Sequence, residues 1–266
     1  MDKMPRYFSH KEKVPEPLSD VYSHFYFATN DSEQPVINTF VPHFKVMLIF
    51  SLGTPISIHL QGQPPLVIEH YFMLGPVKKT FEYCMPPKSS ITVINFNHDG
   101  FHRLFGTGSV DTDLLAVDNN CFLTMWQTLQ TLPTLADSTQ YLLSVGEKYL
   151  SHQNALNLEI NPTQKATDVI KQLAQQQGKN RRTLQMQYKK RLGFSAQEFD
   201  RYQRFVKTIE LIQQHTSANN IPDWADVVFE CGYYDQSHLI RDFQHFLSMT
   251  PSQYLAIQQQ ICLAQK

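Results

Sequence analysis

The segment from Gly232 to Leu255 constrains what this chain can fold into more than any other stretch. It reads as a turn, a short helix with one polar face, and a closing helix. Asp235 is placed to cap the short helix by accepting backbone N–H groups. Apolar residues then recur at helical spacing, which predicts that this helix buries Leu239, Phe243, Phe246 and Leu247.

Hydrogen-bonding side chains occupy the remaining face of the same helix: Gln236, Ser237, His238 and Arg241. Polar side chains of this length near a helix N-terminus are how a recognition helix presents itself to the major groove of double-stranded DNA. The Gln236 amide can form two hydrogen bonds with adenine, whereas Arg241 is expected to contact phosphate. An exposed amphipathic helix without a partner is the alternative.

The stretch from Gly232 to Leu255 resembles the signature of the AraC/XylS family of bacterial transcription regulators. Family members carry two helix-turn-helix units in one C-terminal domain, joined by a long helix, so that two recognition helices enter successive major grooves. The resemblance implies a sequence-specific DNA-binding transcription factor that catalyses no reaction and uses no cofactor. It also implies RNA polymerase as a partner, while a small-molecule effector and a homodimer remain open.

Charge is distributed unevenly along the chain, although the net charge is only −1. From Thr163 onward there are 13 basic and 9 acidic residues, a formal charge of +4, and the first 162 residues carry −5. Between Lys179 and Arg191 the cations lie without any acidic neighbour: Lys179, Arg181, Arg182, Lys189, Lys190 and Arg191. This pattern is typical of a surface that contacts phosphates, with a solvated helix face as the alternative.

Length and composition indicate a soluble globular protein of about two domains. No apolar run approaches the roughly 18 residues that span a bilayer. The first six residues lack the apolar stretch of a signal peptide, so we expect a cytoplasmic protein without membrane contact. The cysteines have no metal-binding spacing, so neither a disulfide nor a zinc site is expected from Cys84, Cys121, Cys231 and Cys262.

A first helix-turn-helix unit is predicted before the long helix. Pro162 suits the first position of a helix capped by Asn161, and an apolar stripe then continues to Gly178. Asn180 is expected to cap the next helix. The inward residues of that helix are Leu184, Tyr188 and Leu192. Its accessible, DNA-facing residues are Arg181, Arg182, Gln185, Lys189 and Lys190.

The long helix between the two units begins at a capping box formed by Ser195 and Glu198. Its predicted core side comprises Phe199, Tyr202, Phe205, Val206, Ile209 and Ile212. The second unit begins at Asp223, a predicted N-cap. The residues of its first helix that we expect to pack inward are Ala225, Val228 and Phe229. Cys231 and Gly232 then form the tight turn.

The first unit departs from the family pattern, because most relatives have an additional helix of about a dozen residues between Gly178 and Asn180. Two interpretations remain open. In one, the helix from Pro162 to Gly178 serves as the first helix of the unit, and a helix near Tyr141 replaces the missing one. In the other, the first unit is truncated and contacts only phosphates. The second unit is therefore the stronger candidate for reading bases.

The N-terminal half is predicted to contain a small antiparallel β unit from Val36 to Asn97. Its strands are expected at 46–50, 56–60 and 90–97, with turns at 53–55 and 61–65. After Gly100 the periodicity becomes helical, and Asp137 or Ser138 is placed to cap a helix. The apolar faces of these helices are formed by Phe101, Leu104, Phe105, Tyr141, Leu142, Val145 and Tyr149.

Together these patterns predict an α+β protein. A β-rich effector or dimerisation domain is expected over residues 1–156, and an all-α DNA-binding domain with two helix-turn-helix units over residues 157–266, with a linker at 154–161. Residues 75–79, 81–83 and 100–106 resemble the β-rich N-terminal domain of one subgroup of the same family. A Pro-Asp-Gly turn common in that subgroup is replaced here by Pro42-His43-Phe44.

A second hypothesis is a metal-binding or enzymatic β domain fused to a helical adaptor that no longer binds DNA. A β-barrel can hold a metal on histidines, and His59, His70, His98 and His102 lie in or near the β unit. No carboxylate has a supporting spacing, so ordinary exposed or hydrogen-bonded histidines are expected instead. Trp126 and Trp224 are expected as core aromatics. A third hypothesis is a helical protein-interaction module that has lost DNA binding.

Overall fold

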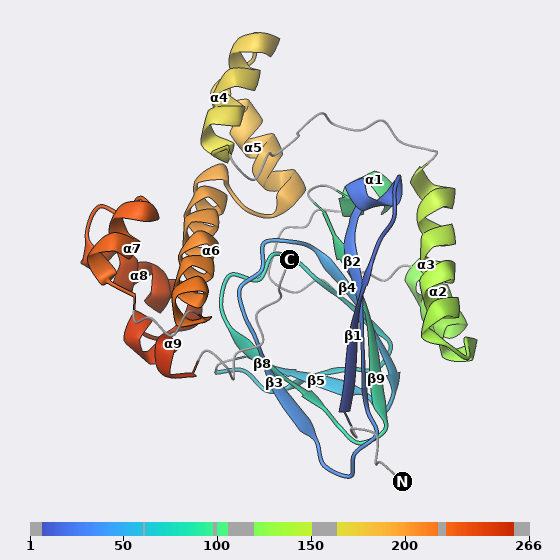
Figure 1. Ribbon diagram of the computed structural model, residues 1–266. Coiled ribbons are helices and arrows are strands. Elements are labelled where there is room, and N and C mark those ends of the chain that lie inside the picture. The colour runs from blue at the N-terminus through green and yellow to red at the C-terminus, as the bar shows by residue number, and fades with distance from the viewer. Residues whose placement is uncertain are drawn as a thin grey trace.

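The computed structural model describes residues 7–60, 62–97, 100–105, 120–150, 164–217 and 222–257. An N-terminal part with two β-sheets and three covering helices lies beside a C-terminal part made of helices (Figure 1). The fold class is α+β, as the sequence predicts. Within the described ranges, no helix is long and apolar enough to cross a membrane.

Two antiparallel sheets form the N-terminal part. The five-stranded sheet has the order β1 (Tyr7–Lys13), β2 (Tyr22–Asn30), β9 (Ser89–Phe96), β4 (Met47–Gly53) and β7 (Tyr71–Leu74). The four-stranded sheet has the order β3 (Val36–Phe40), β8 (Phe81–Met85), β5 (Ile56–His59) and β6 (Leu66–Ile68). The three strands predicted from periodicity correspond to β4, β5 and β9.

Side-chain alternation along β9 shows why the five-stranded sheet is buried on both faces. Ile91 and Val93 join the core between the two sheets. Ile94 and Phe96 point the other way and join the core beneath the helices. Because successive side chains of a strand face opposite sides, a strand covered on both faces is apolar throughout. This strand reads as a continuous buried run for that reason.

The first two strands lie outside the β unit that the sequence predicts, which begins only at Val36. β2 is buried along most of its length and pairs with β1 on one side and β9 on the other. Its central residues, Phe25, Phe27 and Ala28, are all buried, so the strand lacks a clear polar alternation. β1 is mostly exposed and lies at the sheet edge, where a strand signal is weak.

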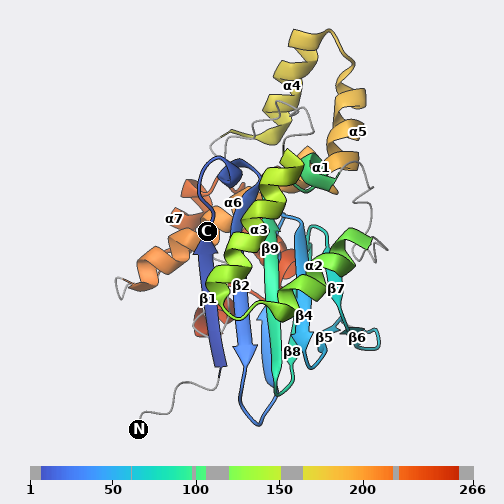
Figure 2. The same ribbon diagram turned by 90° about the vertical axis from the view of Figure 1, so that its right-hand side faces the viewer.

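Three helices accompany the five-stranded sheet: α1 (Gly100–Phe105), α2 (Asn120–Thr131) and α3 (Leu135–Leu150). Figure 2 shows α2 and α3 lying across the face of this sheet. Predicted core residues are confirmed by the burial of Phe101, Leu104, Leu142 and Val145. The predicted cap of α3 is wrong, because Thr134 Oγ1 accepts the backbone N–H of Asp137 and the helix starts at Leu135.

The C-terminal part consists of six described helices around one core. They are α4 (Ala166–Gln177), α5 (Arg181–Leu192), α6 (Ala196–Ser217), α7 (Trp224–Glu230), α8 (Gln236–Leu247) and α9 (Pro251–Ile257). All six contribute to one buried cluster. The predicted linker at 154–161 lies outside the described residues, as do Asn161 and Pro162.

Candidate nucleic-acid interface and β-domain cavity

Helix α8 has the local structure that its sequence predicts. Asp235 Oδ1 accepts the backbone N–H of His238 at 2.7 Å, and Gly232 adopts a φ of +73°, which L side chains avoid. The apolar residues of the helix are buried as expected: Leu239, Phe243, Phe246 and Leu247. Gln236, Ser237 and Arg241 are exposed, so this end of the helix presents polar side chains to the surroundings.

A buried carboxylate fixes α8 against the long helix α6. Asp242 has no exposed surface, and its two oxygens accept hydrogen bonds from Arg201 Nε at 2.6 Å and from an Arg204 terminal nitrogen at 3.0 Å. A buried charge needs such partners, since an unpaired carboxylate in this position is strongly unfavourable. This ion pair is not predictable from local spacing, because both arginines lie about forty positions earlier in the chain.

His238 differs from its neighbours because its ring is engaged inside the protein. Its Nε2 lies 3.0 Å from a terminal nitrogen of Arg204, and its ring packs edge-on against Tyr233 at 5.2 Å between centroids. The Arg204 guanidinium also lies over the Tyr233 ring at 4.8 Å. The half-buried His238 therefore shares the network that holds α8 on α6, while Gln236 and Ser237 are exposed.

The inward face predicted for α7 is wrong in part. Asp223 caps the helix as expected, accepting the Ala225 backbone N–H at 2.8 Å. The buried side, however, is formed by Trp224, Val227, Val228 and Cys231, which recur at helical spacing. Phe229 falls on the opposite side and is 86% exposed, and Ala225 is exposed as well. Tyr234, in the turn that follows, is 91% exposed.

The first unit consists of α4 and α5 in direct succession. Gly178 ends α4 with a left-handed φ of +59°, and Asn180 Oδ1 caps α5 by accepting the Arg182 backbone N–H at 2.8 Å. α3 packs on α1 in the β domain, so it does not replace a helix of this unit. α4 therefore packs directly against α5, and the role that the first interpretation gives to the helix near Tyr141 is wrong.

The start of α4 also differs from the prediction. The helix begins at Ala166 instead of Pro162, and its N-cap residue, Lys165, makes no side-chain cap bond. Instead the Asp200 carboxylate, on α6, accepts the backbone N–H groups of Ala166 at 2.6 Å and Thr167 at 3.2 Å. A cap supplied from another helix satisfies the first donors of α4 and attaches it to the spacer.

Helix α5 presents the basic surface that the charge pattern predicts. The exposed cations are Arg181, Arg182, Lys189 and Lys190, and Gln185 is half-buried among them. Tyr188 and Leu192 are buried on the opposite side, with Leu184 partly buried beside them. An exposed row of cations opposite an apolar face suits contact with a phosphate backbone.

The capping box of the long helix is confirmed. The Ser195 backbone N–H donates to Glu198 Oε2 at 2.8 Å, and the Glu198 N–H donates to Ser195 Oγ at 3.2 Å. Lys78 of the β domain also donates to the Glu198 carboxylate, at 3.0 Å. Burial alone would raise the pKa of Glu198, but the hydrogen bonds from Ser195 and Lys78 outweigh it and hold the pKa at about 2.

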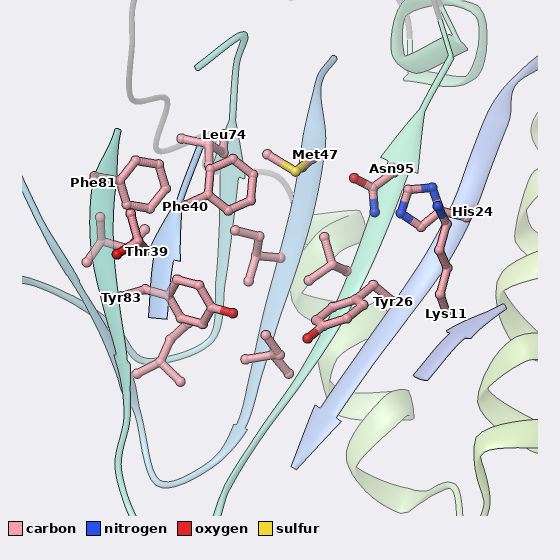
Figure 3. A pocket seen from close by; sticks show the side chains of 15 residues that line it. Lys11, His24, Tyr26, Thr39, Phe40, Met47, Leu74, Phe81, Tyr83 and Asn95 are labelled. Atoms are coloured by element: carbon pink, nitrogen blue, oxygen red, sulfur yellow. The ribbon is translucent and has the colours of Figure 1, made fainter. Parts of the chain in front are cut away.

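The β domain contains a cavity of about 220 Å³ between its two sheets. Most of its wall is apolar, with contributions from Met47, Ile49, Ile58, Leu74, Phe81 and Val93. Lys11, His24 and Asn95 lie together at one end of it, away from Phe40 and Phe81 (Figure 3). A largely apolar pocket with a few polar groups at one end has the composition of a small-molecule site.

The basic end of this cavity continues into a cluster of nitrogen-bearing side chains, which we call the basic cluster: Lys11, His24, His43 and Lys45. Lys45 Nζ donates to Ser23 Oγ at 3.0 Å, and Ser23 Oγ lies 2.7 Å from His24 Nδ1. Burial, and then the neighbouring cations, lower the pKa of both histidines to about 3. Burial and Lys11 also lower the pKa of Lys45. Each shift disfavours the charged form, and a bound anion would oppose it.

The described residues include no group of three or more His, Cys, Asp and Glu side chains that could hold a metal ion. His59 is exposed, with Nε2 2.8 Å from Ser57 Oγ, and His70 packs edge-on against Trp126 at 4.3 Å. Trp126 Nε1 donates to the Ser51 carbonyl at 2.7 Å. His98 and the side chain of His102 lie outside the described part of the chain.

Three solved structures illustrate what the chain resembles. ToxT from Vibrio cholerae is 11% identical, with a TM-score of 0.39, over 95% of this chain and 99% of its own. Wild-type ToxT from Vibrio cholerae strain SCE256 with bound unsaturated fatty acid is 14% identical, with a TM-score of 0.40, over 91% of this chain and 98% of its own. Cobalt(II) HppE in complex with Tris buffer is 10% identical, with a TM-score of 0.28, over 36% of this chain and 56% of its own.

These likenesses are too loose to carry a conclusion, and no match was found among curated proteins. Residues 173–257, by contrast, match the family model described as a helix-turn-helix domain. That range runs from within α4 to the end of α9, so it includes both units and the helix between them. The C-terminal part of the chain therefore contains a helix-turn-helix domain.

Proposed function

We propose that this protein is a transcription regulator that binds specific DNA sequences by reading bases with α8, while α5 contacts the phosphate backbone. The observation that carries the proposal is the contrast on α8 between a buried, doubly paired Asp242 and the exposed Gln236, Ser237 and Arg241. A helix held rigidly by its core side positions its exposed side chains precisely, which base recognition requires.

The residues predicted from the sequence divide into those proposed to contact bases and those proposed to contact phosphates. Gln236 and Ser237 would contact base edges, and Arg241 a phosphate. His238 would act mainly through its contact with Arg204, which helps to hold α8 in place. Phosphate contacts are assigned to the exposed cations of α5, namely Arg181, Arg182, Lys189 and Lys190, with Gln185 beside them.

The β domain, taken as residues 1–156, is proposed to bind a small apolar effector that carries an anionic group. The apolar wall of the cavity would hold the hydrocarbon portion, and the basic cluster would hold the anion. Besides burial, Lys11 and Lys45 lower the pKa of both histidines. An anion would therefore relieve the repulsion between Lys11 and Lys45.

Selection of DNA from a random library with the full-length chain tests the DNA-binding role. The selected duplex should be bound more tightly than a scrambled duplex by about a thousand-fold or more, with affinity falling steeply as salt rises. Equal affinity for both duplexes would contradict sequence-specific binding. Elemental analysis of the same protein tests the metal-binding alternative, since that hypothesis requires stoichiometric metal.

Thermal stability with added decanoate tests the effector role, because a ligand that binds only the folded state raises the melting temperature. We expect decanoate to stabilise the protein more than decanol, which lacks the charge, and we expect Lys11→Met to remove the difference. Equal effects of both compounds would argue against an anion site. Molecular mass measured in solution with and without decanoate shows whether the domain also forms a homodimer.

A further inference from the structure

A loop of the β domain forms part of the core of the DNA-binding domain. Phe44 lies between β3 and β4, is only 6% exposed, and belongs to the buried cluster of the helical part together with Val41. Its ring stacks on Tyr202 with 4.3 Å between centroids and an interplanar angle of 15°. The Tyr202 hydroxyl also donates to the Pro42 carbonyl at 3.2 Å. The contact is therefore both apolar and directional.

Phe44 touches both helix-turn-helix units and the helix between them. Its ring lies 5.1 Å from that of Phe194, in the turn between α5 and α6, and 6.3 Å from that of Phe246 on α8. Tyr202 belongs to α6 itself. A single side chain that packs against all three elements constrains their relative placement, because packed interiors resist continuous deformation.

A second loop of the β domain reaches the same region. Lys78, between β7 and β8, forms an ion pair with Glu198 at the start of α6, with 3.0 Å between the charged atoms. The two loops are paired with each other by backbone hydrogen bonds in both directions between His43 and Val77, each 2.9 Å long. They therefore form one connected surface against the helical part.

Both loops begin and end at residues that line the cavity. The loop that carries Phe44 lies between Phe40 and Met47, and the loop that carries Lys78 lies between Leu74 and Phe81. His43 and Lys45, which flank Phe44, belong to the basic cluster. Within the described part of the chain, no hydrogen-bond partner is found for the buried His43 Nδ1. The residues that anchor the two loops are therefore part of the cavity wall.

We propose that these paired loops couple the β-domain cavity to the placement of the two helix-turn-helix units, with Phe44 as the coupling residue. The inference rests on the proposed function for its biological meaning, since the cavity would be filled by the effector and the units would bind DNA. Coupling of this kind requires the filled and empty cavities to favour different arrangements of the loops. The structure provides a short path of packed side chains for that difference.

A cavity-filling substitution tests the coupling without knowledge of the effector. Val93→Phe adds a ring to the cavity wall, and Ile58→Phe does the same from the other sheet. Val67→Phe is the matched control, because it adds the same volume on an exposed strand outside the cavity. Each substitution is made in the full-length chain, alone and together with Phe44→Leu, which keeps an apolar side chain but removes the ring.

Amide hydrogen exchange of residues 194–205 and 243–247 is the readout, after near-ultraviolet circular dichroism has shown that each variant is folded. Val93→Phe should change these exchange rates by about five-fold or more, the lower end of typical allosteric coupling. In the Phe44→Leu background the change should fall to less than about two-fold, as in a double-mutant cycle with an interacting pair. Lys78→Met, which keeps Phe44, should reduce the change only in part.

Two results would overturn the inference. One is that neither cavity-filling variant alters exchange in the helical part beyond the effect of Val67→Phe. The other is that they alter it equally with and without the Phe44 ring. The hydrogen-exchange measurement involves neither DNA nor an effector. A failure of selective DNA binding would therefore contradict the proposed function without changing the outcome of the coupling test.

Discussion

The two helix-turn-helix units of this protein hold their second helices, α5 and α8, in different ways. In the second unit, α8 is fixed to α6 by the buried Asp242 and by a continuous apolar face. In the first unit, α5 is exposed over most of its surface and its partner helix α4 is capped from α6 by Asp200. In the second unit α8 is thus held in a fixed orientation, whereas in the first unit α5 presents positive charge at its surface.

Under the proposed function, the first unit would supply mainly affinity for DNA and the second unit sequence selectivity. Among the side chains that the structure describes, α5 has four exposed Arg or Lys residues, while α8 has one, Arg241. Phosphate contacts add affinity without sequence information, and base contacts need a helix whose position is fixed.

Asp242→Ala should have the largest effect on stability. The substitution leaves Arg201 and Arg204 without their buried counter-ion, so the free energy of unfolding should fall by about 3–5 kcal/mol. Urea unfolding followed by circular dichroism measures the change. The exposed Asp226→Ala on α7 is the control and should cost less than about 1 kcal/mol. Similar losses in the two variants would show that the carboxylate does not anchor α8.

Asp200→Ala should have a smaller effect that is confined to the first unit. It removes the acceptor for the Ala166 and Thr167 backbone N–H groups, and loss of such a cap costs about 1–2 kcal/mol. Hydrogen exchange should therefore accelerate in α4 and stay unchanged in α8. Asp200→Asn, which keeps an acceptor oxygen, should restore most of the protection. Acceleration in both units would argue that they do not behave as separate bodies.

Lys189→Ala should have the smallest effect and no influence on stability, because the side chain is exposed on α5. Removal of one phosphate contact should lower the slope of log affinity against log salt by about 0.9 and weaken all duplexes alike. Titrations of a selected and a scrambled duplex at several salt concentrations measure both quantities. A loss confined to the selected duplex would place Lys189 at a base edge instead.

The features that the sequence predicts correctly depend on neighbouring residues. Asp235 caps a donor three positions away, and the capping box of Ser195 and Glu198 spans the same interval. The features that it misses depend on distant ones. Asp200 caps a helix 34 residues earlier, and the Tyr202 hydroxyl bonds to Pro42 across 160 residues. Local spacing cannot reveal such pairs, because only the folded chain brings them together.

The error at Phe229 has a related cause. A large apolar side chain in a seven-residue helix looks like a core residue, but the turn at Cys231 and Gly232 fixes which face of α7 meets α8. That face contains Val227 instead. In the β domain, β2 was missed because burial on both faces removes the alternation by which a strand is recognised.

In the proposed function, α8 contacts base edges and α5 contacts only the phosphate backbone. The most direct test measures the affinities of three proteins: Gln236→Ala, Lys189→Ala and the unaltered chain. Each is titrated with a set of duplexes that differ from the selected site at single base pairs. We predict that Gln236→Ala reduces discrimination at one position by about 1–3 kcal/mol, while Lys189→Ala keeps the preference at every position. An unchanged profile for Gln236→Ala, or the same altered profile for both variants, would contradict the claim.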